Sequence, residues 1–127
     1  EKAKINAAKI INNINSIDRA LLSPSMQRKI VPKLSSILEA ARKIKSTDDI
    51  VTARASFEPL SVHYYNIVSE YGTAKEQPVY KYYCPMAFDN TGAFWLQNTE
   101  GVKNPYFGAS MYRCGVLKET LVKLGKE

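Results

Sequence analysis

The chain has 127 residues, of which 45% are hydrophobic, so it is long enough to bury a core of its own and we expect one domain over residues 1–127. Its net charge is +6, but the basic residues alternate with apolar ones and no RNP-like or Arg-rich motif accompanies them. Nucleic acid is therefore excluded as an expected partner. No run approaches the roughly 18 consecutive apolar residues of a membrane span, so none is expected in this chain.

The first two predicted elements are amphipathic helices. Over residues 3–22 the apolar positions recur at steps of three and four: Ala3, Ala7, Ile10, Ile14, Ile17 and Leu21. Ser23 followed by Pro24 is typical of an N-cap and a first helical turn, so a second helix is expected to begin there. Its apolar stripe consists of Met26, Ile30, Leu34, Ile37, Ala41 and Ile44. Pro32 lies inside this stripe and predicts a kink or a short break.

Two further helices are predicted in the rest of the chain. Ser46 or Thr47 can cap a third helix that ends at Gly72. Its expected core positions are Ile50, Ala53, Phe57, Leu60, Tyr64, Ile67 and Tyr71. The range from Ser110 to Leu124 carries one more apolar stripe at helical spacing, which consists of Met111, Cys114, Leu117, Leu121 and Leu124.

Residues 73–109 are too long for a simple connection within a helical bundle. Aromatic side chains give this insertion enough apolar area to be ordered: Tyr80, Tyr82, Tyr83, Phe88, Phe94, Trp95, Tyr106 and Phe107. Within it, Val79–Tyr83 and Ala93–Gln97 can pair as a short β-hairpin. The expected fold is therefore all-α, a four-helix up-and-down bundle with an ordered aromatic-rich insertion between the third and fourth helices.

The chemistry of the chain is expected at its sulfur atoms. Cys84-Pro85-Met86 lies in the insertion and Met111-x-x-Cys114 lies at the start of the predicted fourth helix. Two thiolates and two thioethers form a soft donor set, which favours Cu(I) or Ag(I) over Mg²⁺ or Ca²⁺. At a helix N-terminus the pKa of Cys114 is expected to be lowered, which would favour metal binding.

The same two cysteines permit a purely structural role. Cys84 and Cys114 are 30 positions apart, and a disulfide closing such a loop contributes roughly 3 to 4 kcal/mol on a chain-entropy estimate. Spacing alone slightly favours this disulfide, or a pair of buried thiols, over a metal site. No arrangement of residues indicates a catalytic centre, so no catalytic residue is assigned and the chain is not expected to be an enzyme.

Several short motifs resemble a known protein family. They are Cys84-Pro85-Met86-Ala87, Gly92-Ala93-Phe94-Trp95-Leu96, Asn104-Pro105-Tyr106-Phe107-Gly108, Met111 and Cys114-Gly115, with Ala53-Arg54-x-x-Phe57-x-x-Leu60-Ser61 upstream. In this order the motifs are similar to those of DUF3347, a family of bacterial cell-envelope proteins. The segment Tyr82 to Met86 also resembles the Y-x-C-P-M opening of small heavy-metal-binding domains, although Ala87 stands where those domains have His.

The resemblance implies a periplasmic or cell-envelope location, with a signal or lipoprotein segment removed, and occurrence beside metal-efflux adaptor subunits. Carried over to this sequence, the candidate metal ligands are Cys84, Met86, Met111 and Cys114. Asn104, Pro105, Tyr106 and Gly108 would shape the loop that brings them together. The expected function is Cu(I) or Ag(I) binding for sequestration or hand-over to an efflux adaptor or another envelope protein. The alternative is an interaction domain stapled by a Cys84–Cys114 disulfide, without metal.

Overall fold

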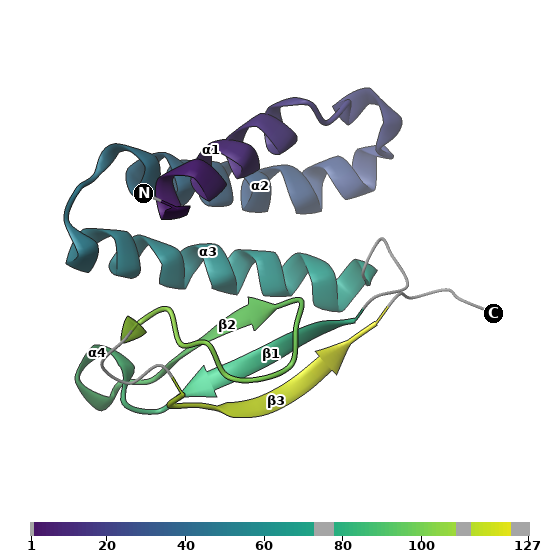
Figure 1. Ribbon diagram of the computed structural model, residues 1–127. Helices are drawn as coiled ribbons and strands as arrows, with labels where there is room; N and C mark the ends of the chain where they lie inside the picture. The colour runs from purple at the N-terminus through teal and green to yellow at the C-terminus, as the bar shows by residue number, and fades with distance from the viewer. Residues whose placement is uncertain (1, 73–77, 109–112, 123–127) are drawn as a thin grey trace. The chain divides into compact units, whose positions relative to one another are not determined.

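The computed structural model describes residues 2–72, 78–108 and 113–122. In chain order the elements are α1 (Lys2–Asn15), the short 3₁₀ helix η1 (Arg19–Leu21), α2 (Pro24–Ser46), α3 (Ile50–Tyr71), β1 (Val79–Cys84), α4 (Ala87–Asn90), β2 (Ala93–Gln97) and β3 (Val116–Leu121) (Figure 1). The chain divides into two compact units, Glu1–Tyr64 and Tyr65–Glu127, and α3 crosses from one to the other.

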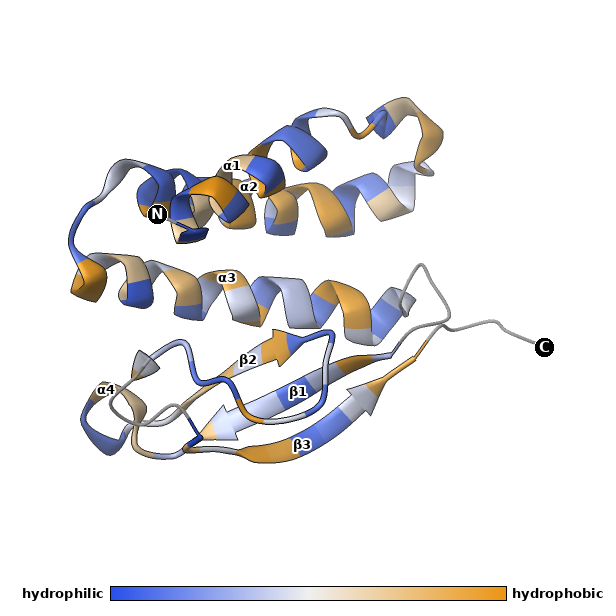
Figure 2. Cartoon of the chain, in the orientation of Figure 1, coloured by the Kyte–Doolittle hydropathy of each residue, from blue (hydrophilic) through white to orange (hydrophobic). Residues whose placement is uncertain are grey.

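In the first unit α1 and α2 form an antiparallel helical pair (Figure 1), with hydrophobic and hydrophilic residues alternating along both helices (Figure 2). The predicted stripes supply the buried side chains Ala7, Ile14, Ile30, Leu34, Ile37, Ala41 and Ile44. The first helix was expected to extend to residue 22 but ends at Asn15, and its expected core positions Ile17 and Leu21 are exposed. The Ser23 hydroxyl accepts a hydrogen bond from the Met26 N–H at 3.2 Å, which confirms the predicted N-cap. The expected break at Pro32 is absent, since α2 runs through it to Ser46.

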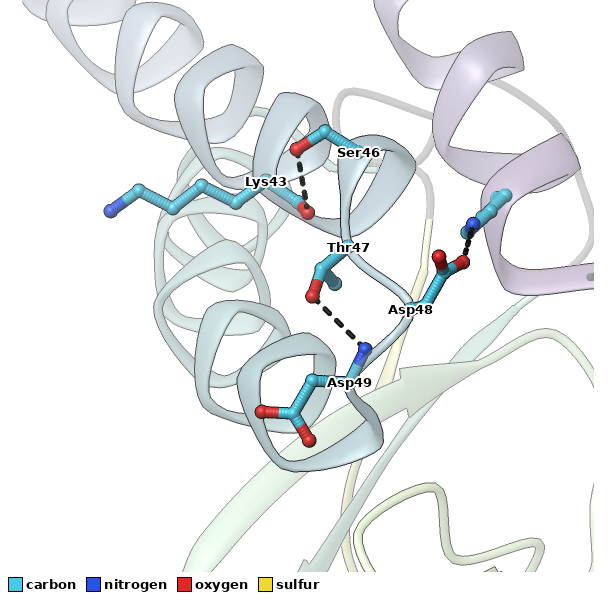
Figure 3. Close-up of polar contacts among 6 residues, drawn as sticks. Lys43, Ser46, Thr47, Asp48 and Asp49 are labelled. Carbon is cyan, nitrogen blue, oxygen red and sulfur yellow. Dashed lines mark hydrogen bonds and ion pairs between the residues drawn. The ribbon is translucent and has the colours of Figure 1, made fainter.

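The connection from α2 to α3 is built from polar side chains (Figure 3). Asp49 caps α3, because its carboxylate accepts hydrogen bonds from the Thr52 hydroxyl at 2.7 Å and the Val51 N–H at 3.2 Å. The Thr52 and Val51 hydrogen bonds lower the pKa of Asp49.

The predicted cap at Ser46 or Thr47 is wrong. The Thr47 hydroxyl accepts a hydrogen bond from the N–H of Asp49, which is the residue before the first residue of α3. Asp48 forms an ion pair with Lys4 of α1.

The buried face of α3 differs from the predicted stripe. Ile50 and Tyr64 were expected in the core but are 56% and 46% exposed. Leu60 is buried as expected, and the helix also buries Ser56, Ser61 and Val68, which were not expected in the core. Small hydroxyl side chains can be buried where their hydrogen bonds are satisfied, and a hydrophobic stripe does not identify such positions. The predicted helix end is confirmed, since Gly72 follows Tyr71 with φ 79°.

The second unit contains a three-stranded antiparallel sheet in the order β2-β1-β3. The expected hairpin is confirmed, because β1 pairs with β2 in a register that places Tyr82 opposite Trp95 and Cys84 opposite Ala93. The all-α prediction is wrong. The fold is mixed α/β, with three long helices and this small sheet in place of a four-helix bundle.

The predicted fourth helix is the element that the structure overturns. Val116–Leu121 is a strand whose backbone pairs with β1, although its leucines have helical spacing. Figure 2 shows hydrophobic residues at both ends of β3 and hydrophilic ones between them. Pairing with β1 satisfies the backbone of two strands at once, which outweighs the helical spacing of a short segment. Residues 110 and 111, where that helix was expected to begin, lie outside the described residues.

The N-cap of α2 gives a direct test of the first unit. Ser23→Ala removes the hydroxyl that accepts from the Met26 N–H and should lower the free energy of unfolding by about 1 kcal/mol. Urea denaturation followed by far-UV circular dichroism measures this change. Ser25→Ala is the matched control, because it deletes a hydroxyl within the same helical turn but outside the cap position. Equal effects of the two substitutions would contradict the assignment.

Candidate functional site

The structure brings the two cysteines together. Cys84 is the last residue of β1, and Tyr83 before it pairs with Val116, the first residue of β3. Cys114 lies two positions before Val116, so the antiparallel register carries it back alongside the end of β1. The two Sγ atoms are 3.4 Å apart. Cys84 is fully buried and Cys114 is half-buried.

Both cysteines are free thiols in this arrangement. A separation of 3.4 Å is well beyond the roughly 2.05 Å of a disulfide and corresponds to contact between two sulfur atoms. One thiol therefore donates a weak hydrogen bond to the other. The pair is close enough to close into a disulfide or around one metal ion after small side-chain movements.

The pKa of Cys114 is raised, which contradicts the expectation of a lowered value. The largest cause is the hydrogen bond with Cys84, followed by partial burial and the charge of the Cys84 thiolate. All three favour the protonated thiol at position 114. The expectation assumed a helix that begins near residue 110 and contains Cys114, whereas Cys114 lies two positions before strand β3.

A buried asparagine holds the chain at Cys114. The Asn104 side chain is completely buried, and its Nδ2 donates a hydrogen bond to the Cys114 carbonyl at 2.7 Å. Its Oδ1 accepts hydrogen bonds from the N–H groups of Tyr106 at 2.8 Å and Phe107 at 3.3 Å. One side chain thus fixes both the turn that follows it and the backbone at the second thiol.

Trp95 forms a rigid platform beneath this region. It is 2% exposed, stacks on Tyr82 with ring centroids 5.9 Å apart and meets the Tyr106 ring edge-on at 6.0 Å. The Tyr106 hydroxyl donates a hydrogen bond to the Phe94 carbonyl at 2.7 Å. A Cβ at Gly115 would lie 3.0 Å from Trp95 Cη2, so only glycine allows the chain to pass this close.

Of the two methionines in the predicted ligand set, Met86 lies within the described residues. Met86 lies two residues after Cys84 at the start of α4, and its side chain is 44% exposed. The α4 segment is a left-handed turn, with positive φ at Phe88, Asp89 and Asn90. Met111 lies outside the described residues. The structure therefore brings together two of the four predicted ligands and gives no position for one of the others.

The described part of the chain contains no cluster of three or more His, Cys, Asp or Glu side chains that could hold a metal ion. Among the described helices, none is both long enough and apolar enough to cross a membrane.

Sequence reasoning missed two supports of this site. Trp95 was expected in a hairpin strand and in a family motif but not as a neighbour of Gly115, and Gly115 was placed inside a helix. The signal for Gly115 was available, since a glycine directly after Cys114 disfavours a helix at that point. The contact of Gly115 with Trp95 depends on the pairing of β1 with β3, which residue patterns alone do not give.

Comparison with known proteins identifies one family. A family model described as a protein of unknown function, DUF3347, matches residues 1–76. The match covers α1, α2 and α3 and includes the Ala53–Ser61 segment, but it ends before Cys84. The cysteine and methionine motifs that carried the resemblance lie outside it. No curated protein and no solved structure gives a significant match.

Gly115→Ala tests the platform beneath Cys114. The new methyl group meets Trp95 at 3.0 Å and the Tyr83 carbonyl at 3.3 Å, with φ 153° at this position. We expect the free energy of unfolding to fall by about 2 to 3 kcal/mol, from backbone strain and steric contact together. Gly101→Ala is the control, because Gly101 also has positive φ but no neighbouring atom within 4 Å of its Cβ position. Urea denaturation that gives equal losses for both variants would contradict the role of the Trp95 contact.

The raised pKa of Cys114 predicts slow alkylation of its thiol. Because Cys84 is the main cause of the shift, Cys84→Ala should move the pH midpoint of Cys114 alkylation by iodoacetamide downward, towards that of an ordinary thiol. Peptide mapping by mass spectrometry follows Cys114 in both proteins. Because the pKa of Cys114 is raised in the folded protein, its interaction with Cys84 contributes to folding stability at pH values below 9.0, the ordinary thiol pKa. This contribution is lost as pH rises through the pKa of Cys114 in the folded protein. An upward shift of the alkylation midpoint of Cys114 in Cys84→Ala would contradict the hydrogen bond between the two thiols.

Proposed function

The chain belongs to the DUF3347 family of proteins of unknown function, and we propose that it binds one soft metal ion, Cu(I) or Ag(I), through Cys84 and Cys114. The observation that supports this most is the 3.4 Å separation of the two Sγ atoms. Two thiols held this close can bind one ion as a chelate. Because folding has already brought the two ligands together, ion binding loses little further chain entropy.

The sulfur separation is compatible with shared coordination. With metal–sulfur distances of about 2.3 Å and a tetrahedral angle, two thiolates on one ion lie about 3.8 Å apart. The thiols would have to separate by only about 0.4 Å from the observed 3.4 Å. Cys84 is anchored at the end of β1, while the half-buried Cys114 is accessible to an incoming ion.

The identity of the donors favours a monovalent soft ion. Thiolates select Cu(I) over the hard ions Mg²⁺ and Ca²⁺, whereas structural Zn²⁺ sites use four thiolate or imidazole ligands. Met86 and Met111 are proposed as thioether donors that complete the set. Because a thiol must lose its proton to bind metal, the raised pKa of Cys114 makes the affinity increase with pH.

In the cell we propose that this module lies in the periplasm or cell envelope and sequesters the ion or passes it to a metal-efflux adaptor. This part of the proposal is supported by the resemblance of the Cys-Pro-Met and Asn-Pro-Tyr-Phe-Gly motifs to envelope proteins found beside efflux systems. A half-buried thiol is suited to hand-over, since an incoming thiol or thioether of a partner can reach the ion there.

A second candidate function rests on the same pair. In an oxidising compartment Cys84 and Cys114 can form a disulfide that ties the chain before β3 to the end of β1. Closing a loop of this length contributes roughly 3 to 4 kcal/mol of stability on a chain-entropy estimate. The protein would then be a structural or interaction domain without metal.

Anaerobic titration of the reduced protein with Cu(I), in competition with a chromophoric chelator, tests the proposal. We expect one-to-one binding that is lost in Cys84→Ser and Cys114→Ser and strengthens as pH rises. Met86→Leu and Met111→Leu should each weaken binding about tenfold, equivalent to about 1.4 kcal/mol. Met26→Leu is the matched control, because Met26 lies in α2 of the first unit, and it should leave the affinity unchanged.

Failure of the reduced wild-type protein to compete with the chelator would refute metal binding. Quantifying free thiols in protein purified without reductant then tests the second candidate. Loss of both thiols, together with a higher thermal unfolding midpoint than that of the reduced protein, would support the disulfide.

A further inference from the structure

We propose that Asn104 is a positioning residue for the thiol pair: its hydrogen bond to the Cys114 carbonyl sets how readily Cys84 and Cys114 react as one unit. For metal binding this inference rests on the proposed function. For thiol–disulfide chemistry it rests only on the closeness of the two sulfur atoms.

The chain at Cys114 needs such a restraint. The β1–β3 register pairs residues from Val116 onward, so Cys114 lies beyond the paired part of the strand. Gly115 stands between them with φ 153°, a conformation that side-chain-bearing residues rarely adopt. A glycine joint gives the preceding residue more conformational freedom than the strand itself has.

Asn104 supplies the restraint from ten positions upstream. Its Nδ2 donates to the Cys114 carbonyl at 2.7 Å, and the side chain is fully buried. A buried hydrogen bond to a carbonyl fixes the orientation of that peptide group, and the direction of the adjoining Cα–Cβ bond with it. The Cys114 thiol is thereby directed towards Cys84.

The anchor of Asn104 is itself rigid. Its Oδ1 accepts the N–H groups of Tyr106 and Phe107, and Pro105 between Asn104 and Tyr106 has a fixed φ. The Tyr106 ring packs edge-on against the buried Trp95 of β2, with ring centroids 6.0 Å apart. Asn104 thus holds Cys114 in place relative to the β1–β2 hairpin, whose first strand carries Cys84.

Asn104→Asp distinguishes the donor role of the Asn104 side chain from its acceptor role. The carboxylate keeps an acceptor for the Tyr106 and Phe107 N–H groups, which favour its ionised form, but it has no donor for the Cys114 carbonyl. Asn104→Ser is a second variant, whose hydroxyl can still cap the turn but is too short to reach Cys114. Tyr106→Phe is the matched control, because it removes a hydrogen bond from the same turn without touching Cys114.

The readout is the thiol–disulfide equilibrium with glutathione. One glutathione disulfide oxidises the two protein thiols: the Cys84–Cys114 bond forms, the glutathione S–S bond breaks, and the two protons and two electrons of the protein thiols pass to the glutathione disulfide, which leaves as two molecules of reduced glutathione. The equilibrium constant measures the effective concentration of one thiol at the other. Near-UV circular dichroism of Trp95 confirms that each variant is folded under the conditions used.

We expect the equilibrium constant to fall about fivefold to tenfold in both Asn104 variants and to stay within twofold of wild type in Tyr106→Phe. The Cu(I) affinity of the Asn104 variants should fall in parallel. Equal constants for Asn104→Asp and wild type would overturn the proposal, as would an equally large change in Tyr106→Phe. Unfolding of both Asn104 variants where Tyr106→Phe stays folded would assign the residue to fold stability and also overturn it.

This design separates the inference from the proposed function. The glutathione equilibrium requires no metal, so a wild-type protein that binds no Cu(I) but shows the Asn104 effect would refute metal binding and uphold the positioning role. Cu(I) binding with an unchanged glutathione equilibrium in the variants would do the opposite.

Discussion

The antiparallel pairing of β1 with β3 is the constraint on which the thiol site depends. It places Val116 opposite Tyr83 and so returns the chain to the end of β1, where Cys84 is buried. The 30 positions between the two cysteines become a 3.4 Å contact through this register. Asn104 and Gly115 then act locally, one by holding the Cys114 carbonyl and the other by allowing the chain past Trp95.

Patterns that repeat within one element predicted much of the fold. The apolar stripe of the second helix, the Ser23 cap and the Gly72 helix end are local signals, and the structure confirms them. The first helix is confirmed only in part, because it ends at Asn15 and Leu21 of its expected stripe is 83% exposed. The β1–β2 hairpin was predicted for the same reason, because two strands rich in aromatic residues flank a short segment that contains glycine. Membership of DUF3347 was also predicted, although the matched residues 1–76 are not those that carry the sulfur motifs.

Features set by distant pairing were not predictable in this way. The leucines of β3 have helical spacing, and only the availability of β1 as a partner makes the segment a strand. The same error gave the wrong direction for the pKa shift of Cys114. A helix dipole was expected to lower this pKa, whereas the neighbouring Cys84 thiol raises it. The sequence could indicate that the two cysteines form a functional or structural pair. It could not indicate that Cys84 is fully buried, that Met86 is exposed, or that Asn104 bonds to the Cys114 carbonyl.

The contact between the Cys84 and Cys114 thiols is proposed to form a soft-metal site. X-ray absorption spectroscopy of the protein loaded anaerobically with one equivalent of Cu(I) tests it most directly, because the method identifies the atoms bound to the ion. We expect a first coordination shell that contains only sulfur and that loses sulfur in Cys114→Ser. A shell dominated by nitrogen or oxygen, or one unchanged by Cys114→Ser, would contradict it.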